Sequence, residues 1–311
     1  MSDPLDHPQP FAMADVPTDI RLARPGDPDY LSRLPPELLR LILQQLLPQD
    51  LAFGFEEQHE WSQSQWILMA KSIDDIFSFG RHVCKNAESC PWGFHMNHSI
   101  YYVSRKIASE ARAVFFSGNV FRFHTDAEPQ LKPSQIFGPL EQRYQKNVLR
   151  ELQRMQIVLR STCDSFERVR RRRSQLQHVV NMLGDHGENT VKALLRSLEV
   201  RDPQPRPIQS GEIDKSMFAL EVLSGLKGLT EVKFEGIPSW FSECLVLQLT
   251  SRGGPSVSVL SWPTTMKKHK KKQKLVTSRA YWQPTLDWKE YAIRNGIELP
   301  ADVDIYFPPS Q

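Results

Sequence analysis

Residues 31–48 read LSRLPPELLRLILQQLLP, the stretch with the clearest spacing and the clearest boundaries in the chain. Apolar residues recur along it every four positions, at Leu34, Leu38, Ile42 and Leu46, and a second set widens that stripe at Leu39, Leu43 and Leu47. This period predicts an amphipathic helix. Prolines suit its first turn, and Pro48 prevents its continuation. We expect the stripe of Leu38, Ile42 and Leu46 to be buried, in part against a helix that carries Val103 and Ile107.

The same residues resemble a known interaction module. The run Leu34-Pro35-Pro36-Glu37-Leu38, followed by Ile42 and Leu46, resembles the opening helix of an F-box, L-P-x-E-[LI] then I-x-x-x-L. A second landmark is VSRKIASEARAVFFSGNVFRF, from Val103 to Phe123. It resembles a helix V-[SC]-R-x-[IV]-x-x-E-A followed by F-[FY]-x-x-N-x-F in F-box-like proteins of filamentous fungi. The two landmarks occur in that family's order.

This resemblance implies a protein-interaction adaptor that serves as the substrate receptor of a cullin-RING (SCF-type) ubiquitin ligase. It implies binding of the Skp adaptor of such ligases by the opening helix, through Leu34, Pro35, Glu37, Leu38 and Ile42. The chain departs from an ordinary F-box, because a long insertion separates Pro48 from Ser99. The insertion favours an alternative, an F-box-like scaffold protein without ligase association.

A third hypothesis, an enzyme, lacks sequence markers. The chain contains no G-x-x-x-x-G-K-[ST], G-x-G-x-x-G, G-x-S-x-G or H-E-x-x-H motif, the patterns that mark phosphate cradles, dinucleotide sites, nucleophile elbows and zincin centres. We therefore predict no enzyme, no catalytic residue and no cofactor.

The composition is that of a folded protein, with 40% hydrophobic and 24% charged residues among 311. Its four cysteines follow no disulfide-framework spacing, and the first residues carry Asp and Pro instead of a basic and then apolar signal. Arg40, Gln44 and Gln45 interrupt the leucine-rich stretch, which falls short of the roughly 20 apolar residues of a membrane span. We expect an intracellular protein, in the nucleus or cytoplasm, with free thiols and no membrane partner.

The chain divides into five parts. Proline-rich residues 1–29 cannot bury enough apolar surface to fold and form a disordered tail. Four parts follow: an F-box-like helical region with an insertion (30–125), a strand-helix layer (140–262), a basic loop (263–278) and a C-terminal segment (279–311). The last part docks on the body through Trp282, Trp288 and Tyr291.

The insertion carries predictions of its own. We expect an irregular link over Leu51–Glu57 and a helix over Trp61–Phe79, where apolar residues recur at helical spacing. Farther along, metal-ligating residue types crowd together at His82, Cys84, Cys90, His95 and His98. Their gaps depart from the close pairs typical of zinc sites. A loop with solvated histidines is favoured, and metal binding stays an open alternative.

Three segments share one spacing: Leu152-x-x-Met155-x-Ile157, Leu195-x-x-Leu198-x-Val200 and Leu229-x-x-Val232-x-Phe234. Each step is long enough for a strand to return through a helix, so we predict neighbouring parallel strands. Asp164 and Glu167 form a capping-box pattern for one intervening helix, and Met217 begins another that ends before Gly225. The fold class is α/β, with the helical segment packed on an irregular strand-helix layer. This layer resembles leucine-rich repeats, with a generic α/β layer as the alternative.

The C-terminal part of the chain carries an expected helix and then a lysine-rich run. Ser239 is expected to cap a helix. Six lysines follow in the sequence KKHKKKQK: Lys267, Lys268, Lys270, Lys271, Lys272 and Lys274. They predict an exposed loop, which is either a nuclear-import signal or a plain solvated segment. An arginine run from Arg168 to Arg173 is interpreted as a solvated helix face, and no motif for specific nucleic-acid binding accompanies it.

Overall fold

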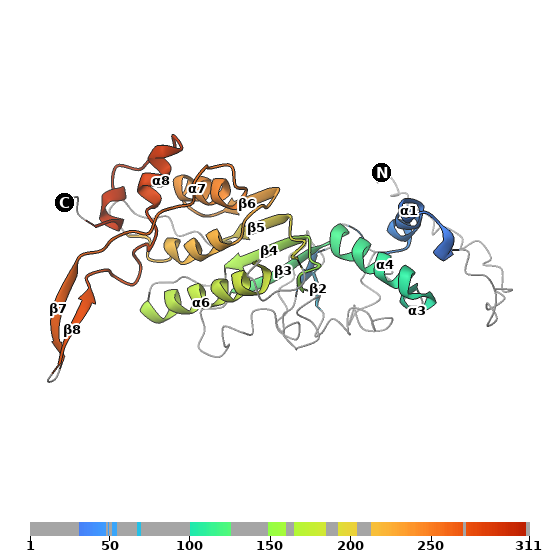
Figure 1. The fold of residues 1–311 in the computed structure, drawn as a ribbon, viewed down its shortest axis with the longest axis horizontal. Coiled ribbons are helices and arrows are strands. Elements are labelled where there is room, and N and C mark those ends of the chain that lie inside the picture. The colour runs from blue at the N-terminus through green and yellow to red at the C-terminus, as the bar shows by residue number, and fades with distance from the viewer. Residues whose placement is uncertain are drawn as a thin grey trace, which may run out of the picture.

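The structure is a computed structural model that describes residues 31–47, 49, 52–54, 67–69, 100–125, 149–159, 165–184, 192–203, 213–269 and 272–308. The N-terminal tail (1–29) lies outside the described residues. The same holds for His82, Cys84, Cys90, His95 and His98, and for Lys270 and Lys271. Within the described residues, a pair of helices at one end adjoins a parallel sheet covered by helices (Figure 1).

Six parallel strands form the sheet, in the order β2-β1-β3-β4-β5-β6. Their bounds are β1 Ala52–Gly54, β2 Ile67–Met69, β3 Val120–Thr125, β4 Arg154–Leu159, β5 Ser197–Arg201 and β6 Glu231–Glu235. Ile157 lies opposite Val200, and Val200 lies opposite Phe234. The predicted parallel pairing of these three segments is confirmed, and the fold is α/β.

The apolar core lies on one face of the sheet. Alternate residues along each strand point to that face. Met155, Ile157, Leu198 and Val200 share one apolar cluster with side chains of three helical elements. These elements are α6 Phe166–Leu183, the 3-10 helix η5 Met217–Gly225 and α7 Ser239–Leu249. Arg150, 3% exposed, donates to the carbonyls of Met182 and Gly184 at 3.0 and 3.2 Å and so fixes the end of α6.

Helix starts differ from the predictions by one residue. Ser165 caps α6 by accepting a hydrogen bond from the Arg168 N–H at 3.4 Å, and Asp164 lies outside the described residues. Ser239 is already inside α7, whose N-cap is Pro238. A serine hydroxyl caps a helix by accepting a hydrogen bond from a backbone N–H. A proline suits a helix start because its fixed backbone angle φ is that of the first turn.

Two predictions for the insertion are wrong where the structure describes it. The expected link contains strand β1, and the expected helix contains strand β2 at Ile67–Met69. Phe53 of β1 lies opposite Phe121 of β3 on one side and Leu68 of β2 on the other. Pairing with an existing edge strand supplies backbone partners that a local helical period does not reveal.

The C-terminal segment packs on the main core. It contains α8 Trp288–Arg294 and the 3-10 helix η6 Val303–Tyr306. Trp288 and Tyr291 are 0% and 1% exposed, whereas Trp282 is half-buried. The Trp288 ring meets Phe241 of α7 edge-on, with ring centroids 5.2 Å apart. Edge-on pairs of this kind contribute about 0.5–1.5 kcal/mol beyond area burial.

The lysine-rich stretch is a hairpin and not a loop. Strands β7 Thr264–His269 and β8 Lys272–Thr277 pair antiparallel, so the predicted loop over 263–278 is wrong in its backbone structure. Like charges placed directly opposite each other are destabilising, which is why the lysine run predicts a loop. Thr264, Thr265 and Val276 near the hairpin base are residue types that favour strands.

Replacing Gly236 by alanine is expected to destabilise the protein by more than about 1 kcal/mol. Gly236 follows β6 with φ +77°, and an added Cβ would lie 2.5 Å from the Asp202 carbonyl oxygen. Gly228 is the matched control, because its φ is +75° and nothing lies within 4 Å of an added Cβ. Urea denaturation of both variants separates the steric clash from the backbone preference. Equal losses would contradict a steric role for Asp202.

Among the described helices, none combines the length and the apolar character that crossing a membrane requires.

Candidate partner-binding surface on the first helix

Helix α1 spans Pro36–Leu46, with Pro35 directly before it and Leu47 directly after it. Pro35 is the N-cap, and its carbonyl accepts the first helical bond from the Leu39 N–H at 3.1 Å. Glu37 lies in the first turn, where a carboxylate favours the positive end of the helix dipole. The Leu47 N–H closes the last turn on the Leu43 carbonyl at 2.8 Å. The predicted helix is therefore confirmed.

One side of α1 packs on α4, Arg105–Gly118, which Ser104 caps by accepting from the Ile107 N–H at 3.3 Å. Leu39 and Leu43 are each 1% exposed, and they share a small apolar cluster with side chains of the later helices. The complete cluster is Leu39, Leu43, Leu47, Ile100, Ile107, Ala111 and Val114. Arg40 and Glu110 form an ion pair at 2.7 Å at its margin.

The side of α1 that adjoins this packed stripe is exposed and apolar. The exposed fractions are 49% for Leu38, 57% for Leu41, 39% for Ile42 and 51% for Leu46. The predicted burial of Leu38, Ile42 and Leu46 is wrong, and Val103 is itself 51% exposed. Two leucine stripes run side by side on this helix, and α4 covers the one formed by Leu39, Leu43 and Leu47. We call Leu38, Leu41, Ile42 and Leu46 the outer face of α1.

The residues implied by the F-box resemblance divide between the two sides. Pro35, Glu37, Leu38 and Ile42 are exposed, whereas Leu34 is half-buried and packs against the α1–α4 cluster. The Leu34 carbonyl also accepts a hydrogen bond from the Lys106 ammonium at 3.4 Å. Leu41 was not predicted from the sequence as a member of the outer face. Leu41 could have been placed on this face from its position three residues after Leu38, since residues three apart are neighbours on a helix.

Helix α4 connects the two apolar clusters. Ile107 and Ala111 belong to the cluster with α1, whereas Phe115 and Phe116 belong to the core of the sheet. Phe116 stands 5.4 Å from the Phe121 ring of β3. Near this junction, Arg112 and Glu151 pair at 2.7 Å, and burial raises the pKa of Glu151 despite that pair. Helix α4 thus joins the helix pair to the sheet by contributing side chains to both clusters.

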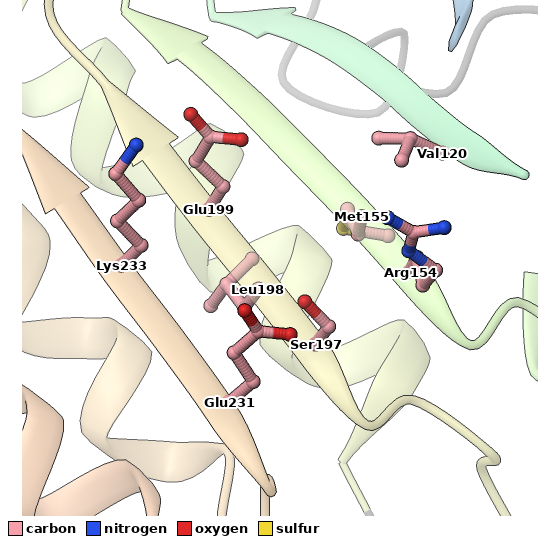
Figure 2. Close-up of a pocket in the computed structure, with 8 residues that line it drawn as sticks. All are labelled: Val120, Arg154, Met155, Ser197, Leu198, Glu199, Glu231 and Lys233. Atoms are coloured by element: carbon pink, nitrogen blue, oxygen red, sulfur yellow. The ribbon is translucent and has the colours of Figure 1, made fainter. Parts of the chain in front are cut away.

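A second surface, not anticipated from sequence, is the sheet face opposite the helices. Register places Arg122, Gln156, Glu199 and Lys233 in one row across β3 to β6. Figure 2 shows Glu199 and Lys233 on the same face of neighbouring strands, beside a cavity of about 100 Å³. The cavity is also lined by Val120, Arg154, Met155, Ser197, Leu198 and Glu231. Its walls are mainly polar and its volume is small, well below the ~300 Å³ of typical ligand pockets.

The described residues also include metal-ligating and nucleophilic side chains. They contain no group of three or more His, Cys, Asp and Glu side chains able to hold a metal ion. Burial raises the pKa of the Cys244 thiol to about 12, so that this cysteine is held as an unreactive thiol at neutral pH. The outer face of α1 is therefore the surface with the clearest capacity for binding, and the partner chemistry it suits is apolar.

Comparisons of this chain with models of protein families, with curated proteins and with solved structures found no match.

Proposed function

We propose that this protein is an interaction adaptor that binds a protein partner through the outer face of α1. The observation that supports it is the set of four exposed leucine and isoleucine side chains on one helix whose adjacent stripe is already packed. Apolar side chains gathered on one exposed face are typical of protein interfaces. A helix that presents them at positions i, i+3, i+4 and i+8 suits a groove in a partner.

The F-box resemblance is the basis for proposing a partner for this face. Pro35, Glu37, Leu38 and Ile42 match the family's opening motif, and all four are exposed. We therefore propose the Skp adaptor of SCF-type ubiquitin ligases as the partner, and substrate reception as the role of the rest of the chain. We place this role inside the cell, in the nucleus or the cytoplasm.

A scaffold role without a ligase is the second candidate. The observation that favours it is the insertion, which carries strands β1 and β2 into the sheet between the two F-box-like landmarks. An α1–α4 pair attached directly to a sheet departs from a self-contained helical module. In this alternative the outer face binds a different protein.

Changing Leu38, Ile42 and Leu46 together to aspartate is expected to weaken adaptor binding at least about 30-fold, which corresponds to loss of one hot spot of about 2 kcal/mol. Calorimetric titration of the full chain with purified Skp adaptor measures the change. The matched control changes Leu194, Val259 and Ile293 to aspartate, because these residues are 45%, 82% and 62% exposed and lie outside α1.

The control variant should bind the adaptor as the unmodified chain does, and all three proteins should melt at similar temperatures. An unmodified, folded chain that does not bind the adaptor would reject the ligase role and favour the scaffold alternative. Equal weakening by both triple variants would reject the outer face as the contact.

A further inference from the structure

Strand β6 ends the order of the sheet, and no strand among the described residues pairs with its outer edge. The Glu231 N–H donates to the Arg196 carbonyl at 3.1 Å, so the backbone of Glu231 faces β5. Backbone groups alternate in direction along a strand of a parallel sheet. Those of Val232 and Phe234 therefore face away from β5, where they can pair with a further strand.

The apolar side chains of β6 are incompletely covered. Val232 and Phe234 pack against the core of the sheet but are only half-buried. One strand farther in, Leu198 and Val200 lie opposite them and are 1% and 0% exposed. A strand added at the edge would cover the remaining apolar surface, and burial of such surface favours association.

The other face of β6 carries alternating charges. Glu231 and Lys233 are exposed and lie on the same face of the strand (Figure 2), and Glu235 continues the alternation. Glu235 already pairs with Arg201 at 3.4 Å, whereas Glu231 lies opposite the uncharged Ser197. A lysine in the middle of an edge strand opposes indiscriminate pairing. Charge therefore decides which strand this edge accepts.

The charges of β6 are complementary to those of a second β6 in one register. A two-fold axis perpendicular to the sheet makes two copies of β6 antiparallel. Pairing Val232 with its own copy then sets each Glu231 opposite the Lys233 of the other chain. Pairing Val232 with Phe234 sets Lys233 opposite Lys233, and like charges directly opposite are destabilising. Pairing Phe234 with its own copy leaves Glu231 opposite the apolar Ile237.

We propose that this chain forms a two-fold dimer in which β6 pairs antiparallel with the β6 of a second copy, centred on Val232. The two Glu231–Lys233 pairs flank the centre as non-hydrogen-bonded pairs, in which side chains lie closest. The two Val232 side chains meet on the apolar face. A short edge buries less area than a standard interface, so the dimer is weak and reversible. This contact is separate from the outer face of α1.

Sedimentation velocity of the full chain, from about 1 μM to about 1 mM, measures the monomer–dimer equilibrium. Glu231→Lys or Lys233→Glu turns both cross-strand pairs from attractive to repulsive. Each variant should therefore dimerise at least about 10-fold more weakly than the unmodified chain. An equimolar mixture of the two variants should recover the dimer, because an edge with two acids then meets an edge with two lysines.

The double variant, which exchanges the two charges, should also recover the dimer. Glu199 lies opposite position 233 within the sheet. Both the double variant and Lys233→Glu place the same charge against Glu199, so a difference between them reports on dimerisation. The matched controls Lys215→Glu and Glu243→Lys change exposed charges outside β6, and they should dimerise as the unmodified chain does.

Hydrogen exchange provides a direct measurement of the edge. Peptides that contain Val232 and Phe234 should exchange more slowly as the protein concentration rises, because their outward N–H groups become bonded. An unmodified chain that stays monomeric over the whole range would overturn the proposal. A mixture that fails to recover the dimer, or an unchanged dimer in Glu231→Lys, would overturn it as well. Loss of the dimer in the outer-face triple variant would place the second copy on α1 instead.

Discussion

Replacing Glu221 by alanine is expected to cost about 3–5 kcal/mol, the usual penalty for breaking a buried ion pair. Glu221 of η5 is 1% exposed, and its carboxylate pairs with the Arg173 guanidinium of α6 at 2.6 Å. It also accepts the Thr285 N–H at 3.0 Å, the Thr285 hydroxyl at 2.6 Å and the Trp288 indole N–H at 3.3 Å. Alanine would leave these donors without the acceptor they share.

Equilibrium denaturation in urea measures this loss, and Glu235→Ala is the control. Glu235 pairs with Arg201 at 3.4 Å, but the two side chains are 44% and 43% exposed, so removing that pair should cost no more than about 1 kcal/mol. Limited proteolysis adds a second measurement. The Glu221 variant should release the C-terminal segment early, since Thr285 and Trp288 both belong to it. A cost below about 1 kcal/mol would contradict the role assigned to Glu221.

Replacing Leu43 by alanine is expected to cost about 2–5 kcal/mol, whereas Ile42→Ala should cost less than about 1 kcal/mol. The two residues are neighbours in sequence, but Leu43 is 1% exposed and Ile42 is 39% exposed. Leu43 belongs to a cluster of only seven buried residues, so the cavity has few neighbours able to collapse into it.

The contrast between these two variants tests which stripe of α1 faces the body. Thermal and chemical denaturation give both values, and adaptor binding by Ile42→Ala provides an independent comparison. A larger loss from Ile42 than from Leu43 would restore the burial expected from sequence and reject the outer face. A loss of binding without loss of stability in Ile42→Ala would agree with a contact role.

The sequence predicted those elements whose pattern is local and long. Strands β4, β5 and β6 carry alternating core residues such as Met155 and Ile157, and the intervening distance permits only a crossover connection. The parallel pairing could therefore be inferred. Strands β1 and β2 have three residues each, too few to show alternation, and the adjacent strand decides their conformation.

The orientation of α1 could not be inferred for a different reason. Leu38, Ile42 and Leu46 repeat with the same period as Leu39, Leu43 and Leu47, so periodicity gives both stripes equal weight. Only the packing of α4 distinguishes them. Likewise, a run of lysines suggests repulsion and a loop, and the antiparallel register of Lys267 with Lys274 becomes visible only in three dimensions.

The α1–α4 pair has a consequence for synthesis on the ribosome. Leu39 and Leu43 emerge long before Ile107 and Val114, the residues that cover them. At translation rates of about 5–20 residues per second, the nascent helix keeps both leucine stripes uncovered for several seconds. We expect this segment to be a chaperone client during that interval, with release timed by the appearance of α4. The order of elements along the chain thus sets a period in which the stripe of Leu39, Leu43 and Leu47 is exposed, and this exposure ends when α4 covers it.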